Sequence, residues 1–130
     1  MNPFDNVSVA KESFAYNDLV GQGKWENWTP TFSLTAVGTP TYSGRFRQLG
    51  RCVQFQVKIV PATSIATTAG TSYMDLPVVA KGYAGIATMT NDTTNVAVGV
   101  AHIDVANSRC YPPTQGASGN TFTLSGFYEV

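Results

Sequence analysis

The chain has 130 residues, and its eight Lys or Arg balance eight Asp or Glu, so that the formal net charge is zero. A chain of this length is expected to form one domain, because it is too short for two ordinary hydrophobic cores. Only 12% of the residues are charged, about half of the share usual in soluble domains. The Lys and Arg residues are scattered and form no basic stripe, so we expect no nucleic-acid partner.

The sequence carries no export or membrane signal. No apolar run approaches the roughly 18 residues of a membrane helix, and the first residues lack the basic start and apolar centre of a signal peptide. We therefore expect no membrane partner and folding in a cytosol. There Cys52 and Cys110 are expected to be reduced thiols, with a disulfide between them as the alternative. With His102 they are too few to ligate zinc, so we expect no metal and no cofactor.

The first 27 residues differ from the rest of the chain. Val7, Ala10 and Phe14 recur at helical spacing, which indicates a short helix, while an extended edge strand is the alternative. Glycines at 21 and 23 then break the pattern. We interpret residues 1–27 as an N-terminal arm and residues 28–130 as the folded domain.

The domain is predicted to be all-β, because it is rich in Thr, Ser, Gly and aromatic residues and is divided into short alternating runs. In residues 31–37 apolar and hydroxyl side chains alternate, as in a strand with one buried face. In residues 51–60 one face holds Val53, Phe55, Val57 and Ile59. Pro61 is expected to end that strand, because proline has no N–H for the ladder.

The remaining elements follow at short spacing. Residues 62–71 are expected to form a loop and residues 73–76 a short strand. The runs 83–90 and 95–103 predict a hairpin, because the residues between them favour a turn. The Pro and Gly residues of 108–120 predict an exposed loop. The final inward face is expected to hold Phe122, Leu124, Tyr128 and Val130. About eight strands result, which favours an antiparallel β-sandwich, jelly-roll-like, over a small closed barrel.

The sequence offers little for catalysis. His102, the only imidazole, shares a strand face with Val96, Val98 and Val100 and is interpreted as a structural histidine. Asp104 stands nearby, but nothing marks a nucleophile elbow or an oxyanion loop. The carboxylates are dispersed and no phosphate-binding glycine loop occurs. We therefore expect no enzymatic activity.

Aromatic residues are the best candidates for partner contacts. Several lie in the arm or where it enters the domain, and one stands beside two prolines in the 108–120 loop. We interpret the arm cluster as a contact with its own domain or with a neighbouring subunit, and stacking on a sugar is the alternative. The candidate partner-binding residues are Phe4, Phe14, Tyr16, Trp25, Trp28 and Tyr111.

Four segments together resemble a known family: the WTPT entry at residues 28–31, TYSGRFRQLGRCVQFQV at 41–57, the DLP strand ending at 75–77 and FTLSGFYEV at 122–130. They resemble the small β-sandwich domain that ends many tailed-bacteriophage tail fibres and recurs in other phage virion surface proteins. The resemblance spans residues 28–130 and brings no catalytic residue with it. It implies a non-enzymatic building block of the virion, commonly a homotrimer, assembled in the host cytoplasm.

Only 27 residues precede the sandwich in this sequence, so the shaft that would hold a fibre tip away from the particle is missing from it. We therefore expect a capsid decoration, or cement, protein that binds the major capsid protein across subunit junctions and stabilises the shell. The alternative is a receptor-binding tip or adaptor, which is attached to a tail or fibre protein and recognises a host surface receptor through its loops.

Overall fold

The structure is a computed structural model that describes residues 23–83 and 85–130. In this part of the chain every regular element is a β-strand, and no helix could span a membrane. The arm lies outside the described residues except for its last few positions. In chain order the strands are β1 (Glu26–Trp28), β2 (Phe32–Ser33), β3 (Thr35–Val37), β4 (Thr41–Leu49), β5 (Cys52–Val60), β6 (Ser64–Thr67), β7 (Tyr73–Asp75), β8 (Ile86–Asn91), β9 (Val96–Asp104), β10 (Arg109–Tyr111), β11 (Gln115–Ser118) and β12 (Phe122–Glu129).

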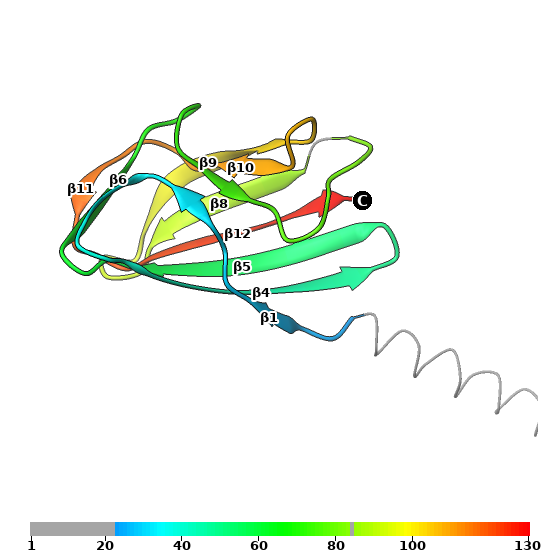
Figure 1. Ribbon diagram of the computed structural model, residues 1–130, viewed down its shortest axis with the longest axis horizontal. Coiled ribbons are helices and arrows are strands. Elements are labelled where there is room, and N and C mark those ends of the chain that lie inside the picture. Colours follow the sequence, from blue (N-terminus) through cyan, green and yellow to red (C-terminus); the bar gives the residue numbers. More distant parts are fainter. Residues whose placement is uncertain (1–22, 84) are drawn as a thin grey trace, which may run out of the picture.

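The strands form two antiparallel sheets that enclose one core (Figure 1). The larger sheet has the order β1-β4-β5-β12-β8-β9-β10-β7-β2 and curls around the core, and the smaller sheet has the order β11-β6-β3. In Figure 1 the smaller sheet lies at the end opposite the C-terminus. The predicted all-β antiparallel sandwich is confirmed. The described residues form twelve strands, compared with the expected eight or so, because several pieces of only two to four residues also pair.

Strand β5 forms the centre of the core, as its alternation predicts. Val53, Phe55, Val57 and Ile59 are at most 1% exposed, and Pro61 follows the last residue of the strand. β5 lies between β4 and β12, with every one of its nine residues paired to β4. From β12 the residues Phe122, Leu124 and Tyr128 join the same core, while Val130 is only partly buried against it.

Three predicted segments are divided differently in the structure. The expected strand 31–37 is broken at Leu34, because β2 pairs with β7 whereas β3 pairs with β6. The expected loop 62–71 contains β6, and the expected loop 108–120 contains β10 and β11. Strands β6 and β11 pair with each other, and the hydroxyl of Thr67 donates a hydrogen bond to the carbonyl oxygen of Pro113 at 2.6 Å. These pairings join residues far apart in the sequence, so the local sequence pattern does not predict them.

The predicted hairpin is confirmed, with β8 paired to β9. Its turn is fixed by Asn91, whose Oδ1 accepts hydrogen bonds from the backbone N–H groups of Thr93 and Thr94 at 3.1 and 3.2 Å. Asn95 then takes a left-handed conformation with φ of 58°, which asparagine tolerates better than most residues. The short polar side chains therefore close this turn as expected.

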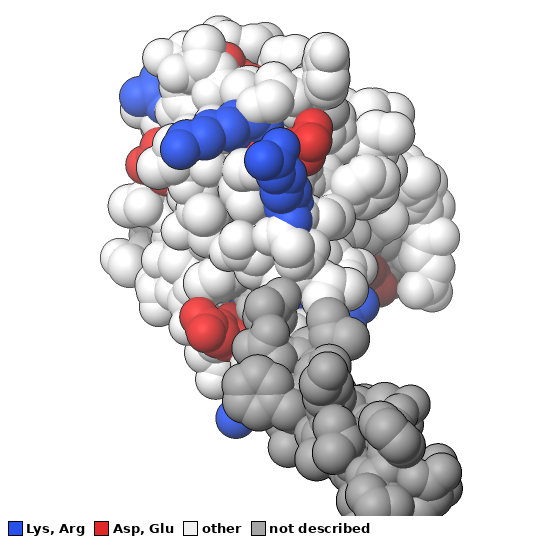
Figure 2. All heavy atoms as spheres, turned by 90° about the vertical axis from the view of Figure 1, so that its right-hand side faces the viewer, with Lys and Arg blue, Asp and Glu red and all other residues white. Residues whose placement is uncertain are grey.

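Charges are sparse on the surface of the sandwich. Figure 2 views the end that carries the C-terminus and the β4–β5 turn, and there a few Lys, Arg, Asp and Glu side chains stand on a mainly uncharged surface.

Strand β1 begins at Glu26, which pairs with Phe46, so the sheet begins two residues before the expected domain boundary at Trp28.

Candidate functional site

Trp25 lies on the outward face of the larger sheet, against two arginines of β4. The guanidinium carbons of Arg45 and Arg47 stand 4.5 and 4.7 Å from the centre of the Trp25 ring. Such cation–π contacts are worth about 0.5–1 kcal/mol each at exposed sites. Each arginine also donates to a glutamine of β5: Arg45 Nε and Nη2 to Gln56 Oε1 at 2.9 and 2.7 Å, and Arg47 Nε to Gln54 Oε1 at 2.9 Å. We call these five residues the Trp25 cluster.

Trp28 lies on the opposite face. Its ring packs at the edge of the core, edge-on to Phe46 with the ring centres 6.1 Å apart. It also covers Gly44, its partner in the β1–β4 register. Residues 25 and 28 are an odd number of positions apart along an extended chain, so their side chains point to opposite sides. The structure therefore does not bring the two tryptophans into one cluster, although both are partly exposed.

The other arm candidates, Phe4, Phe14 and Tyr16, lie outside the described residues. The last candidate, Tyr111, lies on β10 and not on a loop. Its ring is 6.4 Å from that of His102 on β9 and 6.0 Å from that of Tyr73, measured between ring centres. Tyr111 is thus part of an aromatic row that crosses three neighbouring strands.

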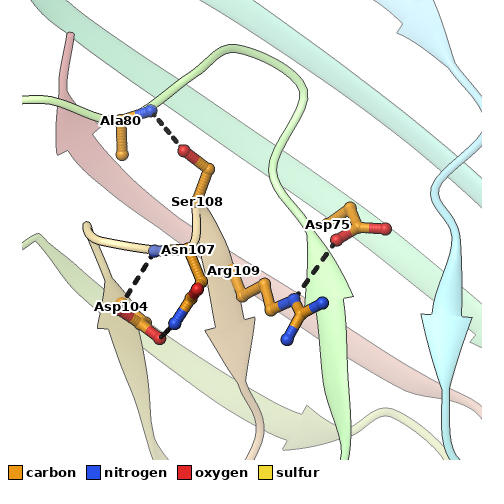
Figure 3. Close-up of polar contacts among 6 residues, drawn as sticks. All are labelled: Asp75, Ala80, Asp104, Asn107, Ser108 and Arg109. Carbon is orange, nitrogen blue, oxygen red and sulfur yellow. Dashed lines mark hydrogen bonds and ion pairs between the residues drawn. The ribbon is translucent and has the colours of Figure 1, made fainter.

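Arg109 on β10 points toward Asp75 on β7 (Figure 3). Its Nε lies 3.7 Å from Asp75 Oδ1, and its guanidinium carbon lies 3.9 Å from the centre of the Tyr73 ring. The turn between β9 and β10 is held by Asn107, whose N–H and side-chain amide donate to Asp104 at 3.3 and 2.8 Å. The hydrogen bond from the side-chain amide of Asn107 is the main reason why the pKa of Asp104 is lowered.

Ser108 fixes the same turn to the segment that follows β7. It has a left-handed φ of 53°, and its hydroxyl accepts a hydrogen bond from the N–H of Ala80 at 3.0 Å (Figure 3). Its carbonyl oxygen accepts another from the N–H of Leu76 at 3.0 Å. The aromatic row is therefore carried on a rigid support.

His102, which the sequence analysis interpreted as a structural histidine, does not lie in the core. Its side chain is exposed, as is its neighbour Val100 at 73%, whereas Ala101 and Ile103 point into the core. Both faces of this strand are apolar in sequence, so the period of two could not decide between them. The core beside β9 already holds large side chains, and it accepts the small Ala101 opposite Ala87.

The described residues hold no metal-binding group, and His102, Asp104 and Tyr111 line one shallow depression. No group of three or more His, Cys, Asp and Glu side chains is close enough to hold a metal ion in residues 23–83 and 85–130. Asp104 is hydrogen-bonded to Asn107. Cys52 is exposed at the start of β5 and Cys110 is buried on β10, both as free thiols, and burial raises the pKa of Cys110 to about 12.

The two arginines and two glutamines of the Trp25 cluster were missed by the sequence analysis. A signal for them exists: RFR at residues 45–47 and QFQ at residues 54–56 each place one phenylalanine inward and two polar residues outward. Because the two segments pair in register, Arg45 faces Gln56 and Arg47 faces Gln54. Recognising the hairpin register would have found the cluster.

The comparisons with known proteins leave the family open. No family model matches the chain, and no match was found among curated proteins or among solved structures.

Proposed function

We propose that this protein is a non-enzymatic structural protein of a bacteriophage virion, which decorates the capsid and stabilises it as a cement protein. The proposal rests on the resemblance of residues 28–130 to phage virion surface domains and on the chemistry of the sandwich surface. Its expected partner is the major capsid protein, bound across subunit junctions, and its expected oligomeric state is a trimer.

The observation that carries the proposal is a charge-poor surface that exposes large apolar side chains. Tyr83 is 85% exposed, Val100 is 73% exposed and Val79 is 65% exposed. Contiguous exposed apolar surface is typical of protein contact sites, and these side chains are the candidates for such a contact. Contacts of this kind depend on packing and hydrogen bonds, so they are expected to change little with salt concentration.

Stabilisation of the shell then follows from mass action. A protein that binds the assembled capsid but not the free subunits shifts the equilibrium toward the assembled form, and the shift grows with the concentration of the bound protein. A rigid sandwich suits this role, because little conformational entropy is lost when its preformed surface docks.

Capsid binding tests the proposal directly. The purified full chain is incubated with undecorated capsids of the phage that encodes it and, separately, with host cells. We expect saturable binding to capsids, with a similar dissociation constant at about 0.15 and about 1 M salt, and a higher temperature of capsid opening. Single serine substitutions of Val79, Tyr83 and Val100 are expected to locate the contact, with at least one of them weakening binding by tenfold or more.

Two results would overturn the proposal. Binding to host cells without binding to capsids would favour a receptor-binding tip instead. Failure of the full chain to bind either one, with its fold intact by circular dichroism, would exclude both roles.

A further inference from the structure

A shallow groove crosses the outward face of the larger sheet. It consists of two depressions of about 380 and about 210 Å³, the first over β1, β4, β5 and β12 and the second over β5, β12 and β8. Both are lined by Gln56, so they are adjacent, one on each side of its side chain. The register places Arg45 opposite Gln56, Gln56 opposite Ser125 and Ser125 opposite Thr88. The groove thus runs across the strands and not along them.

The two ends of the groove differ in chemistry. The end over β4 and β5 is lined by Arg45 and Lys58, and Arg47 stands beside Arg45 on the Trp25 ring. The other end is lined by Phe127 and Ile86, which are 50% and 59% exposed. No Asp or Glu is among the lining residues of either depression. An occupant of this groove should therefore present a carboxylate to one end and apolar rings to the other.

At the basic end of the groove, Arg45 and Arg47 have N–H donors that are not used by the glutamines and could bind a carboxylate. Within residues 23–83 and 85–130 the ion pair that forms is Arg109 with Asp75, and it lies on other strands. A guanidinium group has five N–H donors, and the bonds from Arg45 and Arg47 to glutamines use two and one of them. The Trp25 ring and the glutamines hold both groups in place, so they are ordered before a carboxylate arrives.

The zero net charge of the chain conceals an uneven distribution. Residues 1–22 contain three acidic side chains and one lysine, whereas residues 23–130 contain seven Lys or Arg and five Asp or Glu. The N-terminal segment is therefore acidic and the sandwich is basic, which makes the two complementary. Because the segment belongs to the same chain and joins the sandwich close to Trp25, its binding at the groove would be intramolecular, which raises its effective concentration there.

The order of side chains in the segment matches the order in the groove. Glu12, Phe14, Tyr16 and Asp18 occupy alternate positions, so an extended chain would present all four on one side. Asp18 precedes Trp25 by seven residues, a span of up to about 23 Å when extended. The acid nearest to the sandwich would thus meet the basic end of the groove, and the two rings would lie further along, toward its apolar end.

We infer that residues 12–18 of the same chain bind in this groove, with Asp18 at Arg45 and Arg47 and with the rings of Tyr16 and Phe14 against Phe127 and Ile86. In this arrangement the outward face of the larger sheet binds the acidic segment of the same chain. It does not depend on the proposed capsid role, because it concerns the free protein.

The native thiol of Cys52 provides a test. Cys52 is exposed and lies on β5 at alternate positions with Gln54 and Gln56, next to the basic end of the groove. Asn17→Cys adds a second thiol between Tyr16 and Asp18, and a short bis-maleimide can then bridge the two. Cys110 does not compete, because it is buried and its pKa is raised to about 12. Asn6→Cys is the matched control outside residues 12–18.

We expect a bridge within one chain to form at least tenfold faster in Asn17→Cys than in Asn6→Cys, whereas chain length alone gives a difference of only a few-fold. In the Asn17→Cys background, Arg47→Glu should slow the bridging to the level of the control, and so should Asp18→Arg. Combining the two should restore it, because the exchanged charges again attract. Arg109→Glu, which changes a cation on β10 that lines neither depression, should have no effect.

Three results would overturn the inference: equal bridging rates in the two cysteine variants, a bridge that links two chains into a dimer, or an effect of Arg109→Glu as large as that of Arg47→Glu. The readouts are the mass of the bridged product and its mobility on a denaturing gel, and they need no capsid. Failure here therefore leaves the capsid-binding result unaffected, and failure of capsid binding leaves this result unaffected.

Discussion

The hydroxyl group of Tyr128 makes two hydrogen bonds with the backbone of Val78. It donates to the carbonyl oxygen of Val78 at 2.8 Å and accepts from its N–H at 3.0 Å. Tyr128 is 1% exposed near the end of β12, where its ring lies 6.1 Å from that of Phe55. One side chain of the last strand thus fixes the segment that follows β7 to the core.

Removing this hydroxyl is expected to destabilise the protein. Tyr128→Phe keeps the ring but leaves the N–H and C=O groups of Val78 without these partners, at a cost of about 1–2 kcal/mol. The free energy of unfolding in urea measures the loss. Tyr83→Phe is the control, because Tyr83 is 85% exposed and its change should stay within about 0.5 kcal/mol. Equal stability of Tyr128→Phe and the unchanged protein would contradict this account.

Alkaline pH should destabilise the fold through two buried groups. Burial raises the pKa of the Cys110 thiol from 9.0 and that of the Tyr128 phenol from 10.0, each to about 12. Between the ordinary and the raised pKa the unfolded chain releases protons that the folded chain retains, so stability falls as the pH rises. Below pH 9 these groups contribute no pH dependence.

The urea midpoint, measured at intervals from neutral pH to pH 11, checks this prediction. We expect a decline that begins near the ordinary pKa of the thiol. In Cys110→Ala the decline should begin later, near the ordinary pKa of the phenol, because only Tyr128 then remains. A midpoint of Cys110→Ala with the same pH dependence as the unchanged protein would show that the thiol has no part in it.

The long strands of the sandwich could be predicted because each carries a complete local signal. β5 alternates apolar and polar residues over its whole length and ends before a proline, and β12 shows the same period. The turn at Asn91 is encoded by neighbouring side chains. By contrast, β6 and β11 have four residues each and gain their strand form from each other, across about fifty positions of sequence.

The candidate site was predictable only in part, for a related reason. Trp25 stands where the chain enters the sheet, as its place in the sequence indicates, whereas Tyr111 was expected on a loop and lies on β10. The partners of both residues could not be predicted from the sequence. Arg45 and Arg47 reach Trp25 through the β1–β4 pairing, and His102 reaches Tyr111 through the β9–β10 pairing. A pattern of period two also leaves the face undecided where both faces are apolar, as it does for His102.

A methyl group at Gly44 should disturb the entry of the chain into the sheet. A Cβ there would come within 2.7 Å of Trp28 Cε3 and 3.2 Å of the Trp28 carbonyl oxygen. We expect Gly44→Ala to cost about 1–3 kcal/mol, because the indole ring must shift from its place against Phe46. Unfolding in urea followed by tryptophan fluorescence measures both the stability and the altered ring environment.

Gly116→Ala is the matched control for Gly44→Ala. Gly116 also lies within a strand, but a Cβ there has no heavy atom within 4 Å. Its substitution should leave stability unchanged or raise it slightly, because alanine reduces the freedom of the unfolded chain. If both substitutions have the same effect, the close approach of Trp28 is not what requires glycine at position 44.

The side chain of Asn107 should control the titration of Asp104. Its amide hydrogen bond is the main cause that lowers the pKa of Asp104 below the ordinary 3.8, and a backbone hydrogen bond from the same residue adds to it. Because the pKa of Asp104 is lowered in the folded state, its ionised carboxylate stabilises the fold at pH values above the ordinary pKa. This stabilisation is lost as the pH falls through the lowered value.

Asn107→Ala is therefore expected to raise the pKa of Asp104 toward 3.8. It should also reduce the loss of stability that protonation of Asp104 causes at acid pH. A titration of the carboxyl carbon shifts by nuclear magnetic resonance measures the change. Asn91→Ala is the control, because Asn91 closes the β8–β9 turn and makes no hydrogen bond to Asp104 in the described part of the chain. A pKa of Asp104 that stays low in Asn107→Ala would assign the effect to the backbone N–H groups of the turn instead.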